Sequence, residues 1–188
     1  MTWIESISRE KATGYLKRLY QDYQRPNRTI ANIYRAHSLR PHTLEGHVTL
    51  YRAVLGHADN ELPLWYLEAV GLYVSVLNQC DYCIDHHTHA GGLVYPGEAE
   101  AWATITDVLL NDRTANVFKG KELALLTYAR NLTLDPTSLT ATSIDVLRGV
   151  SASDSEILEV NQVASYFAYA NRVVLGLGVT LDGEVQAD

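Results

Sequence analysis

Apolar side chains recur at intervals of three and four residues along most of the chain. In residues 62–77, for example, Leu64, Leu67, Val70 and Val74 follow this spacing, which matches one face of an α-helix. No stretch alternates apolar and polar residues over four or more positions, as a half-buried strand would. The pattern therefore predicts an all-α protein with helices over residues 8–24, 29–37, 41–56, 62–77, 80–93, 96–109, 120–132, 136–149 and 154–177.

Local signals mark where two of these helices begin or end. Ser153 and Glu156 have the spacing of a capping box before the last long helix, in which the side chain of each residue binds the backbone N–H of the other. Asn78-Gln79 offers a break after the helix over 62–77, because asparagine tolerates the left-handed conformation that ends helices. The sequence therefore predicts a turn at this point, with a new helix starting near Cys80.

The 188 residues are most simply one all-α domain with a core over about residues 35–180. A weak internal repeat gives a second interpretation. When Glu159 is set over Glu68, Asn171 falls over Cys80, so the chain could hold two copies of one helical unit of which only the first keeps the thiols. Two helices of unlike origin would show similar apolar spacing, and both interpretations stay open.

Residues 68–89 hold the chemistry. Both cysteines of the chain, Cys80 and Cys83, form a Cys-x-x-Cys; His87 follows Cys83 by four residues, and Glu68 precedes Cys80 by twelve. On one straight helix Glu68 would lie about 18 Å from Cys80, at 1.5 Å per residue. With a turn at residues 78–79, the two helices run antiparallel and Glu68 and His87 fall at similar depth. We expect these two side chains to meet.

This arrangement suits thiol chemistry. Cys83 and His87 share one helix face, because they stand at positions i and i+4. Thiols in the first turn of a helix lie at the positive end of its dipole, which favours the thiolate. A neighbouring imidazole can take the proton, and a carboxylate such as Glu68 can orient the imidazole. Cys80 lies in disulfide reach and would resolve an oxidised Cys83.

Two other interpretations use the same residues. Cys80, Cys83, His87 and either His86 or His89 could supply four zinc ligands, but all of them lie on one short helix, whereas a structural zinc site normally joins two separated segments. Glu68 and His87 could also be ordinary helix residues without a role. The combined spacing favours the redox interpretation, for which no cofactor and no metal is expected.

The motif of a glutamate, eleven residues, Cys-x-x-Cys, three residues and a histidine resembles the signature of the alkylhydroperoxidase D and carboxymuconolactone decarboxylase superfamily. Glu68, Cys80, Cys83 and His87 fit it without a gap. The resemblance extends over about residues 35–180 and points to the peroxidase-related branch through three further segments, residues 51–55, 125–130 and 171–178.

The resemblance implies an AhpD-like helical bundle that assembles as trimers or hexamers. It also implies a peroxidase that reduces hydrogen peroxide or organic hydroperoxides, with Cys83 as the attacked thiolate, Cys80 as the resolving thiol and an external dithiol as reductant. The chain departs from the family at Tyr82, where the best-studied members carry a second relay histidine between the cysteines. The alternatives are a decarboxylase-like enzyme that acts on a small carboxylated ring with His87 as base, and a redox-sensing or metal-binding oligomer without turnover.

Composition and charge narrow the partners. A formal net charge of −7 disfavours nucleic acid and acidic membrane surfaces. The chain has no apolar run of membrane-spanning length and its first residues lack the pattern of a secretory signal, so we expect a cytoplasmic redox pair. Residues 62–77 and 157–177 are apolar around most of their circumference and carry tyrosines suited to interfaces. These features predict a homo-oligomer, and the tyrosines concerned are Tyr66, Tyr73, Tyr166 and Tyr169.

Overall fold

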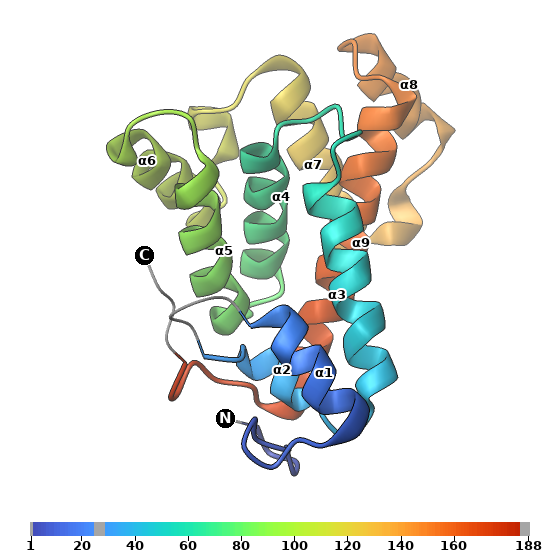
Figure 1. Cartoon of the computed structure of the whole chain (residues 1–188). Helices are drawn as coiled ribbons and strands as arrows, with labels where there is room; N and C mark the ends of the chain where they lie inside the picture. The colour runs from blue at the N-terminus through green and yellow to red at the C-terminus, as the bar shows by residue number, and fades with distance from the viewer. Residues whose placement is uncertain (1, 25–28, 185–188) are drawn as a thin grey trace. The chain divides into compact units, whose positions relative to one another are not determined.

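The structure, a computed structural model, describes residues 2–24 and 29–184. Throughout these residues the regular elements are helices and no strand occurs (Figure 1), so the all-α prediction is confirmed. The helices are α1 (Gly14–Tyr23), α2 (Asn32–Ala36), α3 (Pro41–Gly56), α4 (Leu64–Leu77), α5 (Asp81–Val94), α6 (Ala99–Leu110), α7 (Gly120–Leu134), α8 (Ala141–Gly149) and α9 (Asp154–Leu177), with short 3-10 helices η1 (Thr114–Asn116) and η2 (Pro136–Ser138).

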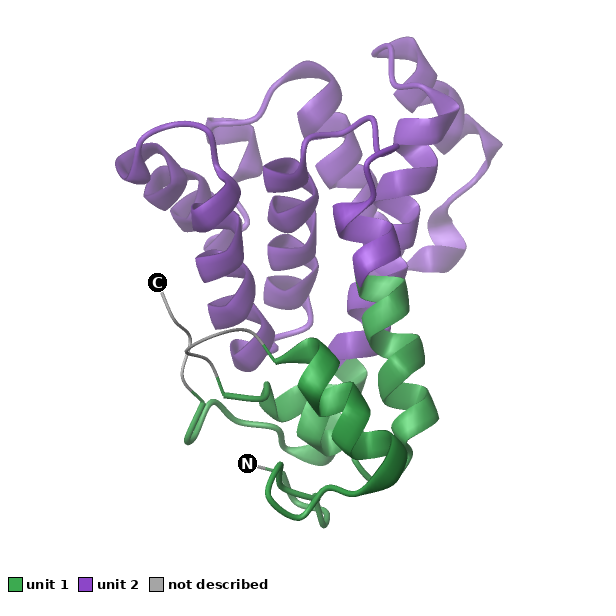
Figure 2. Ribbon diagram, in the orientation of Figure 1, with its two compact units in different colours: residues 1–51, 172–188 green, residues 52–171 purple. Residues whose placement is uncertain are grey.

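The chain divides into two compact units (Figure 2). Unit 1 comprises residues 1–51 and 172–188, and unit 2 comprises residues 52–171, so the boundaries fall within α3 and α9. Unit 2 contains the whole of residues 68–89. The description of the chain as one domain, and the internal repeat, stay predictions.

Unit 1 has an apolar core formed by α1 and α3. Leu16, Leu19 and Tyr20 of α1 are buried with Leu44 and Val48 of α3. The first helix was expected from residue 8, but α1 begins only at Gly14. Residues 8–12 instead form tight turns, in which backbone N–H groups bind carbonyls only three residues back.

Helix α4 is the centre of unit 2. Ten consecutive residues, 66–75, are buried, because α5, α6 and α7 all pack against this helix (Figure 1). Tyr66 and Tyr73, which suggested a subunit interface, are buried here, and the Tyr66 hydroxyl donates to the backbone oxygen of Glu122 at 2.5 Å. The apolar circumference of α4 thus finds its partners inside the chain and gives no argument for an oligomer, which stays a prediction.

The turn between α4 and α5 lies at residues 78–79, as predicted, but the left-handed conformation belongs to a different residue than expected. Asn78 keeps a right-handed conformation (φ −85°), and Gln79 takes the left-handed one (φ 57°). The backbone N–H of Cys80 then donates to the carbonyl of Ser75, five residues earlier, at 2.9 Å. This is the six-to-one bond that closes a Schellman-type helix end. Cys80 therefore ends α4 with its backbone and stands at the N-cap of α5.

The capping box of α9 is confirmed: the Ser153 N–H donates to Glu156 Oε2 at 2.9 Å, and the Glu156 N–H donates to Ser153 Oγ at 3.0 Å. Helix α5 continues through Gly91 and Gly92 to Val94. Gly91 leaves room for Trp102 of α6, since a Cβ there would lie 2.1 Å from that ring. No helix in the described ranges combines the length and the apolar character that a membrane crossing requires.

Candidate functional site

Cys80 and Cys83 lie together at the start of α5. Cys80 is the N-cap residue and Cys83 belongs to the first turn. Both are free thiols, exposed by only 0% and 4%, and their Sγ atoms share a hydrogen bond of 2.7 Å. A pair at this separation can close to a disulfide with little movement of the backbone.

The two thiols differ in acidity. The hydrogen bond with Cys83 lowers the pKa of the Cys80 thiol and outweighs the opposing effect of burial. The hydrogen bond with the Cys80 sulfur, together with burial, raises the pKa of Cys83. Because the two sulfurs share a hydrogen bond, loss of one proton leaves the pair sharing the other, at the positive end of the α5 dipole. The role of Cys83 as the attacked residue stays a prediction.

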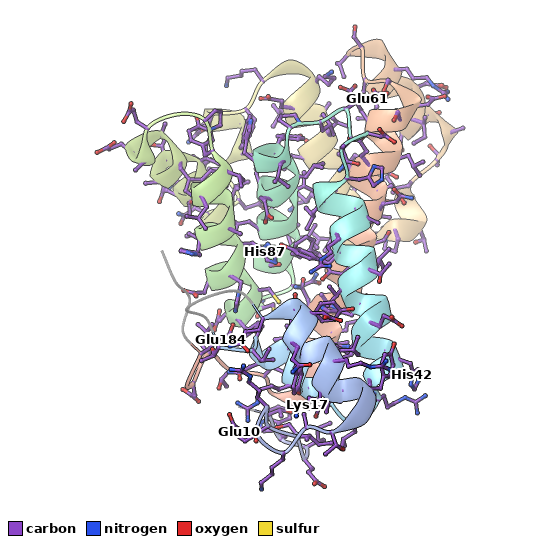
Figure 3. The ribbon with its side chains drawn as sticks, viewed as in Figure 1. Glu10, Lys17, His42, Glu61, His87 and Glu184 are labelled. Atoms are coloured by element: carbon purple, nitrogen blue, oxygen red, sulfur yellow. The ribbon has the colours of Figure 1, made fainter. Side chains whose placement is uncertain are left out.

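Glu68 of α4 and His87 of α5 meet, as the spacing predicted. His87 Nδ1 lies 2.6 Å from Glu68 Oε2, and the side chains are exposed by only 14% and 5%. Figure 3 shows His87 on the side of α5 that faces α4. A carboxylate only accepts hydrogen bonds, so Nδ1 carries the donated proton, and in the neutral ring Nε2 is the basic nitrogen. The contact fixes both the orientation and the tautomer of the imidazole.

Phe167 of α9 covers His87 from another side. Its ring meets the imidazole edge-to-face, with centroids 4.4 Å apart and an interplanar angle of 81°. The ring also lies directly against Gly71 of α4, where a Cβ would come within 2.2 Å of it. The glycine thus permits the close approach through which α9 holds the histidine in place.

Asn171 of α9 also belongs to this site. It is exposed by only 1%, and after the larger effects of the Cys80–Cys83 hydrogen bond and of burial, its amide acts toward a lower pKa at both thiols. Asn78 and Ser75 of α4 bind the same amide at 2.9 and 3.1 Å. Sequence analysis placed Asn171 in a segment that resembles the family and opposite Cys80 in the possible repeat, but it did not predict contacts with Ser75 and Asn78, which lie more than 90 positions away.

The remaining candidates on α5 do not form a metal centre. The Tyr82 ring is buried and lies against His86, with centroids 4.5 Å apart. Over residues 2–24 and 29–184, no three or more histidine, cysteine, aspartate or glutamate side chains are grouped so that they could hold a metal ion. The ligand set considered for zinc, which required His86 or His89 beside the thiols, is therefore not gathered in this structure.

No protein-family model matches the chain, and no curated protein matches its sequence. Solved structures do. An uncharacterized peroxidase-related protein from Ralstonia eutropha JMP134, described as an alkylhydroperoxidase AhpD core, superimposes with a TM-score of 0.81 at 15% identity, over 95% of this chain and 91% of its own. An uncharacterized peroxidase-related protein from Silicibacter sp. TM1040 gives 0.74 at 17% identity, over 88% and 82%.

The debrominase Bmp8, a cysteine-to-alanine variant of which was solved in complex with 2,3,4-tribromopyrrole, has a TM-score of 0.67 at 14% identity, over 90% of this chain and 82% of its own. Identities this low show a common fold and not a common activity. The chain has the AhpD-like fold, and the expectation of that fold from the Cys-x-x-Cys motif is confirmed.

Proposed function

We propose that this protein is a thiol-dependent peroxidase that reduces hydrogen peroxide or organic hydroperoxides through Cys80 and Cys83. One observation carries the proposal: two free, buried thiols in hydrogen-bond contact start the same helix whose next turn bears a histidine fixed by a buried glutamate. A dithiol with an oriented base can carry out the two-electron reduction of a peroxide, because one sulfur attacks the peroxide and the other resolves the sulfenic acid.

In the proposed reaction, the thiolate charge moves to Cys83 when the Cys80–Cys83 pair redistributes its shared proton. The Cys83 sulfur attacks one peroxide oxygen, the O–O bond breaks, and the other oxygen leaves as an alcohol or water after gaining a proton. Cys83 is then a sulfenic acid. The Cys80 sulfur attacks the Cys83 sulfur, water leaves, and a disulfide forms. An external dithiol returns two electrons and two protons to restore both thiols.

His87 supplies the proton transfer in this scheme. Nε2 of a neutral His87 takes the thiol proton and returns it to the departing oxygen, while Glu68 holds the ring and stabilises the imidazolium that forms. Help of this kind is worth about 10²–10⁴-fold in rate. The proposal also includes a hydroperoxide substrate, an external dithiol as reductant and a trimeric or hexameric assembly. The resemblance to the superfamily supports these three parts.

The proposal is tested by peroxide consumption of the purified protein with a dithiol reductant, alongside mass spectrometry of the two cysteines. We expect sustained turnover with a Cys80–Cys83 disulfide intermediate. Cys83→Ser should abolish turnover, and Cys80→Ser should leave Cys83 as sulfinic acid because no thiol resolves the sulfenic acid. Equal turnover in Cys83→Ser and the unmodified protein would contradict the mechanism.

A second candidate is reductive debromination of a small aromatic ring. The debrominase Bmp8 has the same fold, and replacing bromine by hydrogen needs the two electrons that a dithiol provides when it closes to a disulfide. Bromide release from 2,3,4-tribromopyrrole under the same conditions, without peroxide consumption, would favour this candidate. A decarboxylase that uses His87 as base would instead stay active after both thiols are alkylated.

A further inference from the structure

The chemistry of a hydroperoxide places its substituent beside His87. In the proposed reaction, the Cys83 sulfur attacks the terminal oxygen of R–O–O–H, and the O–O bond breaks. The oxygen that leaves is the one bonded to R, and it takes its proton from His87. This transfer requires that the leaving oxygen lies within hydrogen-bond reach of the imidazole. The group R, bonded to the same oxygen, therefore has to fit among the side chains that surround His87.

Those side chains leave little room. Glu68 occupies one side of the imidazole, with its Oε2 atom 2.6 Å from Nδ1. Phe167 lies against the ring edge-to-face, with centroids 4.4 Å apart. Glu68, Cys83 and Phe167 are buried, and the His87 side chain is exposed by only 14%. Interiors packed this closely have few voids larger than a water molecule. A hydrogen atom fits in the place of R, whereas a phenyl-bearing group requires that a side chain moves.

Phe167 is the bulkiest side chain in contact with His87. Its ring also fills the space over Gly71 of α4, where a Cβ would come within 2.2 Å of it. Gly71 stands three residues after Glu68, on the same face of the helix. The ring thus occupies the volume beside the Glu68–His87 pair that an aromatic substituent would need. Truncation to alanine would leave an apolar cavity of about the size of benzene, and such cavities bind small aromatic molecules.

We propose that the thiol site is selective for hydrogen peroxide over bulky, and above all aromatic, hydroperoxides, and that Phe167 is the residue that determines this selectivity. The proposal rests on the peroxidase function proposed above. Phe167 acts by excluded volume: it occupies the space into which a large substituent on the leaving oxygen would extend. A pocket discriminates by size in this way, and a single methylene group is worth about 10–200-fold in specificity.

The test compares two hydroperoxides in the unmodified protein and in Phe167→Ala. Steady-state turnover with a dithiol reductant gives kcat/KM for hydrogen peroxide and for cumene hydroperoxide, which carries a phenyl ring. In the unmodified protein, hydrogen peroxide should have the higher value by about tenfold or more. Phe167→Ala should raise the ratio of the cumene hydroperoxide value to the hydrogen peroxide value at least about tenfold. A loosened His87 alone would lower both values together and leave their ratio unchanged.

Phe118→Ala is the matched control. Phe118 is the other phenylalanine of the chain and is also buried. Its ring meets Tyr66 near the start of α4, with centroids 6.1 Å apart, whereas the thiols follow the end of that helix. This variant should melt at a lower temperature but keep the ratio of the unmodified protein. Should Phe167→Ala fail to fold, Phe167→Leu removes part of the ring and should raise the ratio about threefold.

Thiol alkylation separates this proposal from the peroxidase function. N-phenylmaleimide and iodoacetamide compare a phenyl-bearing reagent with a small one in the absence of peroxide, when each rate is divided by that of free cysteine. Phe167→Ala should raise the ratio of the two normalised rates about tenfold. The same shift in a protein that consumes no peroxide would uphold the size limit set by Phe167 and refute the peroxidase function. A folded Phe167→Ala whose two ratios equal those of Phe118→Ala would overturn the proposal.

Discussion

Gly71→Ala should destabilise the protein, although the substitution of glycine by alanine inside a helix ordinarily does the opposite. Gly71 lies in the middle of α4 and is buried. A Cβ added there would lie 2.2, 2.3 and 2.8 Å from three atoms of the Phe167 ring. Carbon atoms that are not bonded normally stay about 3.5–4.0 Å apart, so the ring would have to retreat by about 1.3 Å.

Phe167 has little room for such a movement. Its side chain is fully buried, its ring meets His87 at 4.4 Å between centroids, and it meets Tyr166 at 5.3 Å. Overpacking of this kind costs about 1–3 kcal/mol, and the helix preference of alanine offsets about 1 kcal/mol. The net loss should be up to about 2 kcal/mol, or up to about 8 °C in Tm for a chain of this length. Displacement of the ring should also loosen His87 and lower any peroxide turnover.

Thermal and urea unfolding followed by circular dichroism measure the loss. The control is Gly46→Ala, also within a helix, where an added Cβ meets nothing within 4 Å; it should stabilise by about 0.5–1 kcal/mol. In a Phe167→Leu background the clash is relieved, so Gly71→Ala should cost much less there. The reasoning is refuted if Gly71→Ala stabilises the protein as Gly46→Ala does.

Two further predictions concern charge. Glu68→Gln preserves side-chain volume but removes the carboxylate that fixes the His87 tautomer, and it should lower peroxide turnover about 10²-fold. Steady-state assays of peroxide turnover check this. The control is Glu159→Gln, which should leave turnover unchanged. Glu159 is also a buried glutamate, but its partners are the backbone N–H groups of residues 61 and 62. Burial, and secondarily the stacked His37, lowers the pKa of His47 to about 3. The unfolded chain binds this proton near pH 6.5, so the contribution to the free energy of unfolding is complete above that pH and falls by about 1.4 kcal/mol per pH unit between pH 6.5 and 3. Urea unfolding measures this free energy across the range. In His47→Gln, the free energy of unfolding should fall less steeply with decreasing pH.

Local patterns in the sequence were enough to predict the helices and the contact between Glu68 and His87. Both follow from local rules: apolar spacing sets the helices, and a turn directly after residue 77 fixes the register of an antiparallel pair whose members are adjacent in the chain. The capping box at Ser153 and Glu156 was readable for the same reason, because its two partners stand three residues apart.

The exact helix ends and the residue with the left-handed conformation were harder to predict from the sequence. The first helix begins at Gly14 and not at residue 8, and the turn before Cys80 places Gln79, not Asn78, at positive φ. The intrinsic preferences of Asn and Gln for positive φ favour Asn78 only weakly over Gln79. The exact position is chosen by the bond from the Cys80 N–H to the Ser75 carbonyl, a contact that belongs to the folded turn.

The residues that α9 contributes around His87 and the α4–α5 turn depend on tertiary packing. Phe167 and Asn171 come from α9, and they reach the site because Gly71 admits an aromatic ring and because α4 presents Ser75 and Asn78 to an amide. Periodicity states which face of a helix is apolar, but it does not state which other helix covers that face or at what height. The close packing of side chains in the core determines both which helix covers a face and at what height. The four motif residues therefore share their site with residues of α9, a helix far away in the sequence.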